Sequence, residues 1–261
     1  MQILHEHPAQ SHADQKIRLI CMAAQMMLEN GGETYRVEET AMRMAIGLGL
    51  DDVNVVAFPT SIFVNVDGRS RIRRITHRGT NSSRLAGVND VSRRVERGEL
   101  TPDEAERALD AIAADPGFSQ LMLILAYGVS AASFSLLFGG TFGSLLVALV
   151  VGMLAQLIQP FFAHMAMGTL LFNFCGGFMT ALLCRATSNV IAYGDVNAAI
   201  IGGIMPMLTG LLMTTAVRDT MYGDLISGIA RAVEALLLAG CVALGVFVGL
   251  KVVVMLGGMP L

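Results

Sequence analysis

Five charged side chains stand close together in an otherwise apolar part of the sequence: Arg218, Asp219, Asp224, Arg231 and Glu234. An arginine can bind a carboxylate through two parallel hydrogen bonds, and an aspartate or glutamate can bind an ammonium group or carry a proton. Arg231 and Glu234 are three residues apart, so they fall on one face of a helix and can pair. The sequence therefore predicts a substrate-binding pocket for a small charged solute, formed by these five residues.

Glycine and proline interrupt the apolar segment just before these charges. Gly202, Gly203, Pro206 and Gly210 fall within residues 197–217, a run otherwise long enough to cross a bilayer. In hydrocarbon an unpaired backbone group costs several kcal/mol, so a helix break at that depth needs protein or a water-filled cavity around it. Transporters build binding sites from broken helices of this kind. We interpret the segment as a helix break beside a solute site; the alternative is a kinked helix and a solvated loop at the membrane interface.

Charge is distributed unevenly along the 261 residues. Residues 1–118 hold 14 of the 18 Lys and Arg and 17 of the 21 Asp and Glu, although the whole chain is 54% hydrophobic. This balance is not that of an ordinary soluble domain, and a net charge of −3 gives no basic footprint for nucleic acid. We expect a flexible tail at 1–13, a cytoplasmic α+β domain at 14–118 and a transmembrane domain at 119–261.

The polar domain shows two pairs of helices around a run of strands. Residues 14–32 and 33–49 carry apolar side chains at helical spacing, three strands follow between 53 and 77, and Thr101 and Pro102 begin a last helix as N-cap and first residue. The basic third strand could bind an anion, although a solvated sheet face is the commoner role. No P-loop, nucleophile elbow or zinc-protease motif occurs, and the four cysteines lack metal spacing. We therefore expect no enzyme, no cofactor and no metal site.

Five apolar segments are candidates for membrane helices. About 20 residues are needed to cross a hydrocarbon core of about 30 Å, and the segments that meet or approach this length are 119–138, 142–159, 164–184, 197–217 and 233–256. Small residues recur along them, which allows helices to approach closely in a membrane. Five helices enclose a pathway in few ways, so we expect a partner subunit or a homo-oligomer, besides membrane lipid. The expected fold is an α-helical membrane protein with five transmembrane helices, preceded by a small α+β cytoplasmic domain.

Several long stretches of the chain resemble the threonine/serine exporter family. They are LENGGETYRVEETAMRMAIGLGL at 28–50, FPTSIFVNV at 58–66, VNDVSRRVERGELTPDEA at 88–105, and the apolar-to-charged segment 200–237. Length and number of spans resemble the long subunit of the family's split form, the YjjP type, which is paired with a short membrane subunit of the YjjB type. The resemblance implies a secondary exporter in the bacterial inner membrane for small carboxylate-bearing metabolites, such as threonine, serine or succinate. A membrane-anchored regulatory or scaffold protein without transport activity is the alternative.

Overall fold

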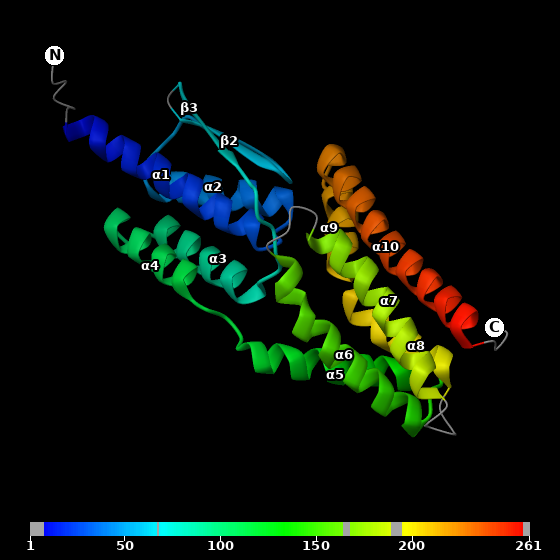
Figure 1. Ribbon diagram of the computed structural model, residues 1–261. Coiled ribbons are helices and arrows are strands. Elements are labelled where there is room, and N and C mark those ends of the chain that lie inside the picture. Colours follow the sequence, from blue (N-terminus) through cyan, green and yellow to red (C-terminus); the bar gives the residue numbers. More distant parts are fainter. Residues whose placement is uncertain (1–7, 67, 164–167, 189–194, 258–261) are drawn as a thin grey trace, which may run out of the picture. The chain divides into compact units, whose positions relative to one another are not determined.

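The computed structural model describes residues 8–66, 68–163, 168–188 and 195–257. The chain forms two units (Figure 1). The N-terminal unit comprises Met1–Asp115 and Leu212–Ala232, and the helical unit comprises Pro116–Leu211 and Val233–Leu261. We expected one boundary, after residue 118. Instead Leu212–Ala232 groups with the N-terminal unit, because its polar side chains find their partners there, as described below.

Two helices begin the N-terminal unit, α1 (Pro8–Glu29) and α2 (Thr34–Gly47). Residues 8–13, expected in the tail, are already helical, since proline is tolerated in the first turn of a helix; residues 1–7 lie outside the described residues. The predicted apolar face of α1 is buried. The helix ends at Gly31, whose φ is +90°, and the N–H groups of Gly31 and Gly32 donate to Leu28 O and Met27 O at 3.3 and 2.9 Å. This is a Schellman ending, which a glycine at the left-handed position makes possible.

A three-stranded antiparallel sheet lies over α1 and α2 in Figure 1, in the order β1 (Val53–Phe58), β2 (Ser61–Val66), β3 (Arg69–Arg74). The predicted strands are confirmed, although the third runs from Arg69 to Arg74 rather than over 71–77. One face is buried against the two helices through alternate apolar residues, namely Val53, Ala57, Ile62, Val64 and Val66. The period of two along each strand thus matches a sheet with one core face.

Helices α3 (Ser82–Glu96) and α4 (Pro102–Ala114) complete this unit, packing on α1 and α2. The predicted N-cap of α4 is confirmed as a full capping box. Thr101 Oγ1 accepts the Glu104 N–H at 3.4 Å, and Glu104 Oε2 accepts the Thr101 N–H at 2.9 Å. Such a reciprocal pair satisfies two N–H groups that the first helical turn leaves open.

The helices that follow residue 118 are mostly apolar. Among the residues that the structure describes, four helices are long and apolar enough to cross a membrane, or five spans result if the bent pair α8–α9 is one broken span. The elements are α5 (Gln120–Leu137), α6 (Phe142–Ala163), α7 (Gly168–Ser188), α8 (Val196–Ile204), the 3₁₀ turn η1 (Met205–Met207), α9 (Gly210–Met221) and α10 (Leu225–Gly257).

The second apolar helix does not end at Gln159, as the sequence suggested, because α6 continues to Ala163 with Pro160 inside it. A proline has no N–H, so the carbonyl four residues earlier, that of Gln156, loses its helical donor. Gln120 Nε2 of α5 lies 3.5 Å from this oxygen. A neighbouring helix therefore supplies the donor, as membrane helices with internal prolines require.

Gly202 and Gly203 lie inside α8 and do not break it. A Cβ on Gly202 would come within 2.5 Å of Ala131 O in α5, and one on Gly203 within 2.8 Å of Thr180 Cγ2 in α7. Only glycine fits at the first of these contacts without a backbone shift. The two glycines thus allow α8 to pack closely between α5 and α7.

The break itself comes after Ile204. Pro206 lies in η1 and Gly210 begins α9. The carbonyl of Pro206 accepts a hydrogen bond from the hydroxyl of Tyr127, on α5, at 2.8 Å. Protein therefore surrounds at least this backbone group at the break, which is the condition that a break at membrane depth must meet.

Candidate functional site

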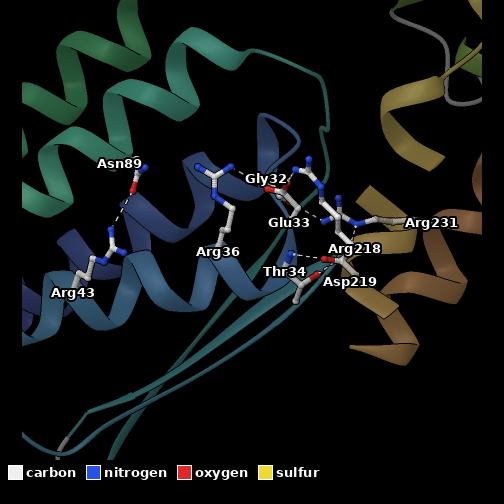
Figure 2. Close-up of polar contacts among 9 residues, drawn as sticks. All are labelled: Gly32, Glu33, Thr34, Arg36, Arg43, Asn89, Arg218, Asp219 and Arg231. Carbon is white, nitrogen blue, oxygen red and sulfur yellow. Dashed lines mark hydrogen bonds and ion pairs between the residues drawn. The ribbon is translucent and has the colours of Figure 1, made fainter. Parts of the chain in front are cut away.

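The carboxylate of Asp219, near the end of α9, is completely buried and bound on both oxygens (Figure 2). Its Oδ1 accepts the Thr34 N–H at 2.9 Å, and its Oδ2 accepts the Thr34 hydroxyl at 3.2 Å. The same Oδ2 forms an ion pair with Nε of Arg231, on α10, at 3.0 Å. A buried charge is tolerated when paired and hydrogen-bonded in this way.

Asp219 takes the place of a helix cap. The N-cap residue of α2 is Glu33, whose own side chain makes no capping hydrogen bond. The first N–H groups of a helix have no intrahelical partner, and the partial positive charge there favours an anion. Asp219, 185 residues further along the chain from Thr34, supplies this anion. The sequence 217–221 thus completes the start of α2.

Arg231 also binds the backbone just before α2, at Gly32. Its side chain is 5% exposed, and its Nη2 donates to the carbonyl of Gly32 at 2.8 Å. Gly32 is the last residue of the α1 ending, and a Cβ there would come within 2.8 Å of Met27 O. Arginine can serve two acceptors because its donors form a rigid planar fork. Arg231 therefore ties Asp219 to the α1 ending.

Glu33 lies between two guanidinium groups. Its Oε1 accepts from Arg218 Nη1 at 2.6 Å, and its Oε2 accepts from Arg36 Nη1 at 3.2 Å. Although burial alone would raise its pKa, a backbone hydrogen bond and the two arginines hold the pKa of Glu33 below its ordinary value. The Arg218 side chain remains 59% exposed. Arg218 thus has one side bonded to protein and the other open.

Two further carboxylates lie beside this cluster. Asp224 stands half-buried before α10, and burial, with the nearby charge of Asp219, raises its pKa. Glu38 of α2 accepts the Ala57 N–H of β1 at 2.9 Å. Burial raises the pKa of Glu38, and Asp224 adds to this shift, although the Ala57 hydrogen bond opposes it. These two groups are suited to hold a proton at a higher pH than an ordinary carboxyl would.

The short loop that connects α9 to α10 also contacts α2. Gly223 has φ +95°, and the ring of Tyr222 stacks on that of Tyr35 with centroids 3.9 Å apart. A Cβ on Gly228 would come within 2.1 Å of Thr220 Oγ1, so glycine allows the two helices to approach. We call residues 212–232 the hairpin and residues 32–35 the turn.

The structure brings three of the five predicted site residues together at the turn, Arg218, Asp219 and Arg231. Asp224 lies near enough to Asp219 to feel its charge, and Glu234 stands half-buried one helical turn beyond Arg231, in the helical unit. Sequence reasoning missed the partners, which are Gly32, Glu33, Thr34, Arg36 and Glu38. One signal could have indicated them: glutamate stands at an N-cap where Ser, Thr, Asp or Asn is preferred, so an outside cap was needed.

Residues 18–253 match the family model ThrE, which describes threonine/serine exporters. The chain belongs to the threonine/serine exporter family. This family of exporters, together with the long apolar helices, makes it a multi-pass membrane protein. Among the described residues no group of three or more His, Cys, Asp or Glu side chains could hold a metal ion.

Curated relatives of this exporter-family chain come from several bacteria. It is 27% identical over 255 residues to the "Probable threonine/serine exporter" of Mycobacterium tuberculosis and 24% identical over 226 residues to the "Threonine/serine exporter" of Corynebacterium glutamicum. These alignments cover 92% and 83% of the chain but 46% of each relative, so the chain spans about half their length.

A third relative has a similar length. It is the "Probable succinate transporter subunit YjjP" of Klebsiella aerogenes, 25% identical over 238 residues, with 88% of the chain and 90% of the relative covered. No solved structure matches the chain.

Proposed function

We propose that this chain is a subunit of a secondary exporter for small carboxylate-bearing metabolites, such as threonine, serine or succinate. The observation that carries the proposal is the match of residues 18–253 to an exporter family. The names of two relatives refer to threonine and serine, and that of a third refers to succinate. All three solutes carry a carboxylate, which is the shared feature that the site must recognise.

A second polypeptide is part of the proposal. In the two longer relatives about half of the protein lies outside the matched region, and the third relative is named a subunit. We infer that a short membrane subunit of the YjjB type supplies the missing half of the pathway. The N-terminal unit then faces the cytoplasm, and the apolar helices span the bacterial inner membrane.

Arg218 and Asp224 are the proposed solute contacts. Arg218 keeps 59% of its side chain exposed while it bonds Glu33, so a solute carboxylate can reach its guanidinium. Asp224 has a pKa raised by burial, which suits a carboxyl that binds an ammonium group or carries a coupling proton. Asp219, Arg231 and Glu234 were predicted with them, but for Asp219 and Arg231 the contacts with the turn favour a different role.

One observation favours a membrane-anchored regulatory or scaffold protein instead. Three of the five charges beside the helix break bond to the N-terminal unit itself, and such contacts serve an anchor as well as a transporter. The broken span favours transport, because an anchor has no use for backbone groups that need partners at membrane depth.

Efflux measurements separate these two functions. Cells that lack the gene are compared with cells that express it, with and without the short partner, after loading with threonine or succinate. Export predicts faster efflux of at least one solute when both subunits are present, and its loss in Arg218→Ala and Asp224→Asn at normal membrane levels. Equal efflux of both solutes with and without the gene contradicts the export function.

A further inference from the structure

Each of the four residues of the turn contacts a different residue of the hairpin. Three of these contacts are the polar bonds of Gly32, Glu33 and Thr34 described above, and the fourth is the stacking of Tyr35 on Tyr222. Figure 2 shows the polar groups converging from α9 and α10 on the start of α2. We call this set of contacts the joint. A one-to-one match along four residues fixes both the position and the register of the hairpin.

The chemistry of the joint favours specificity over stability. Asp219 is completely buried, and the side chain of Arg231 is 5% exposed. The desolvation of a buried ion pair offsets most of its Coulomb attraction, and such pairs are best attested as devices that select one arrangement over others. The joint therefore has the properties of an element that holds two segments in a defined geometry.

The joint holds α9, the helix that follows the break, and the start of α10. α9 begins at Gly210, directly after the break, and carries Asp219 in its last turns; α10 carries Arg231 in its second turn and continues as a candidate span. A helix transmits a displacement of one end to the other, since its backbone hydrogen bonds resist bending. A shift of the turn would therefore reach the break through α9.

We propose that Thr34, Asp219 and Arg231 are positioning residues for transport: the joint sets the place of α9 beyond the break without contacting the solute. This inference rests on the proposed export function. A solute-binding role for Asp219 conflicts with its burial, because both of its oxygens already bind Thr34 and one also faces Arg231. The N-terminal unit thus controls the broken span through three side chains.

Two disruptive variants, Thr34→Val and Asp219→Asn, and one conservative variant, Thr34→Ser, test the joint in the full chain, co-expressed with the short partner. Thr34→Val removes the hydroxyl that donates to Asp219 and keeps the N–H, whereas Thr34→Ser keeps both. Asp219→Asn keeps an acceptor for the N–H and removes the charge that faces Arg231. Matched controls are Thr76→Val and Asp110→Asn, at exposed positions of the same unit.

Two readouts are needed, initial efflux rates at several internal solute concentrations and hydrogen exchange of the amides of residues 33–36. We expect Thr34→Val and Asp219→Asn to lower the maximal rate about tenfold, the effect of losing one hydrogen bond to a charged group, with an unchanged half-saturating concentration. Exchange at 33–36 should rise in both. Thr34→Ser and the two controls should resemble the wild type in both readouts.

Other results of the two measurements would contradict either the inference or the export function on which it rests. Faster exchange with unchanged efflux makes the joint merely structural and overturns the inference. A raised half-saturating concentration with an unchanged maximal rate makes these residues solute ligands and also overturns it. Unchanged exchange in Asp219→Asn contradicts the joint itself. No efflux from the wild type defeats the export function instead, and the exchange data then still report whether the contacts exist.

Discussion

Two glutamates at the start of α2, Glu33 before it and Glu38 in it, have pKa values shifted in opposite directions. Glu33, before α2, has a lowered pKa because arginines and a backbone hydrogen bond outweigh its burial. Glu38, one turn into α2, has a raised pKa because burial and the charge of Asp224 outweigh the Ala57 hydrogen bond. A lowered folded-state pKa adds stability above the unfolded pKa, and a raised one adds it only below. The two residues must therefore respond to pH in opposite directions.

Glu33→Gln should destabilise the N-terminal unit at neutral pH. The contribution of the ionised carboxylate is present above the ordinary glutamate pKa and is lost as pH falls through the lowered pKa. We expect a loss of about 1 to 2 kcal/mol at pH 7, since Arg218 is partly exposed to solvent. Hydrogen exchange of α1 amides, corrected for intrinsic rates, measures it between pH 5 and 8. A loss that grows toward acid pH would contradict the proposed ion pairs.

Glu38→Gln should stabilise the N-terminal unit at alkaline pH, in contrast to Glu33→Gln. Above its raised pKa the ionised Glu38 is penalised by burial and by Asp224, whereas a glutamine oxygen can still accept the Ala57 N–H. We expect slower exchange of α2 amides than in the wild type at pH 8, with the difference vanishing as pH falls through the raised pKa. Glu39→Gln, on the exposed face of α2, is the control; because it removes an ion pair with Arg43, it should not slow exchange at pH 8. Faster exchange at pH 8 would refute the assigned cause of the shift.

At the scale of elements, the glycines around the break differ in whether they allow a close helix contact. Gly202→Ala should separate α8 from α5, because the new Cβ would come within 2.5 Å of a backbone oxygen. We expect a destabilisation of about 1 to 3 kcal/mol, the usual effect of overpacking. Gly210→Ala is the control, since nothing lies within 4 Å of its Cβ. Unfolding of the detergent-solubilised protein by SDS measures both; equal effects would contradict the close contact of α8.

The hydroxyl of Tyr127 should stabilise the folded helical unit through its hydrogen bond at the break. Tyr127→Phe removes the hydroxyl that donates to the half-buried carbonyl of Pro206, so we expect a loss of about 1 kcal/mol, the usual net contribution of one hydrogen bond. Ser133→Ala also removes a hydroxyl from α5, but one that bonds its own helix at Val129 O. The same SDS titration compares the two variants. If Ser133→Ala destabilised the protein as much as Tyr127→Phe, the bond to Pro206 would have no special contribution to stability.

Local sequence accounts for some of these elements and not for others. The strands 53–58 and 61–66 and the capping box of Thr101 were predictable, because residues a few positions apart determine them. The continuation of α6 past Pro160 depends on a donor from α5, and the role of Gly202 depends on α5 packing beside it. The charges of the hairpin were found, but Thr34, the partner of Asp219, lies 185 residues away from it, and no local pattern encodes that contact.

At the scale of the molecule, a stretch from the apolar half of the sequence belongs to the N-terminal unit. Leu212–Ala232 groups with Met1–Asp115, through contacts that bury Asp219, Thr34 and Arg231. Contiguous contacts of this kind usually open together, as one cooperative unit. The hairpin should therefore lose its protection when the N-terminal core is weakened, although its neighbours in sequence belong to the helical unit.

Leu109→Ala tests this coupling. Leu109 of α4 is completely buried, so its truncation should cost about 2 to 5 kcal/mol. We expect faster hydrogen exchange in α1, α2 and the hairpin, with α5 and α6 unchanged. Val151→Ala, a buried position of α6, is the reciprocal variant and should accelerate exchange in α6, α7 and α8, whose residues share its buried cluster, and not in the hairpin. If the hairpin responded to Val151→Ala and not to Leu109→Ala, it would belong energetically to the helical unit, and the N-terminal unit could not control it through the joint.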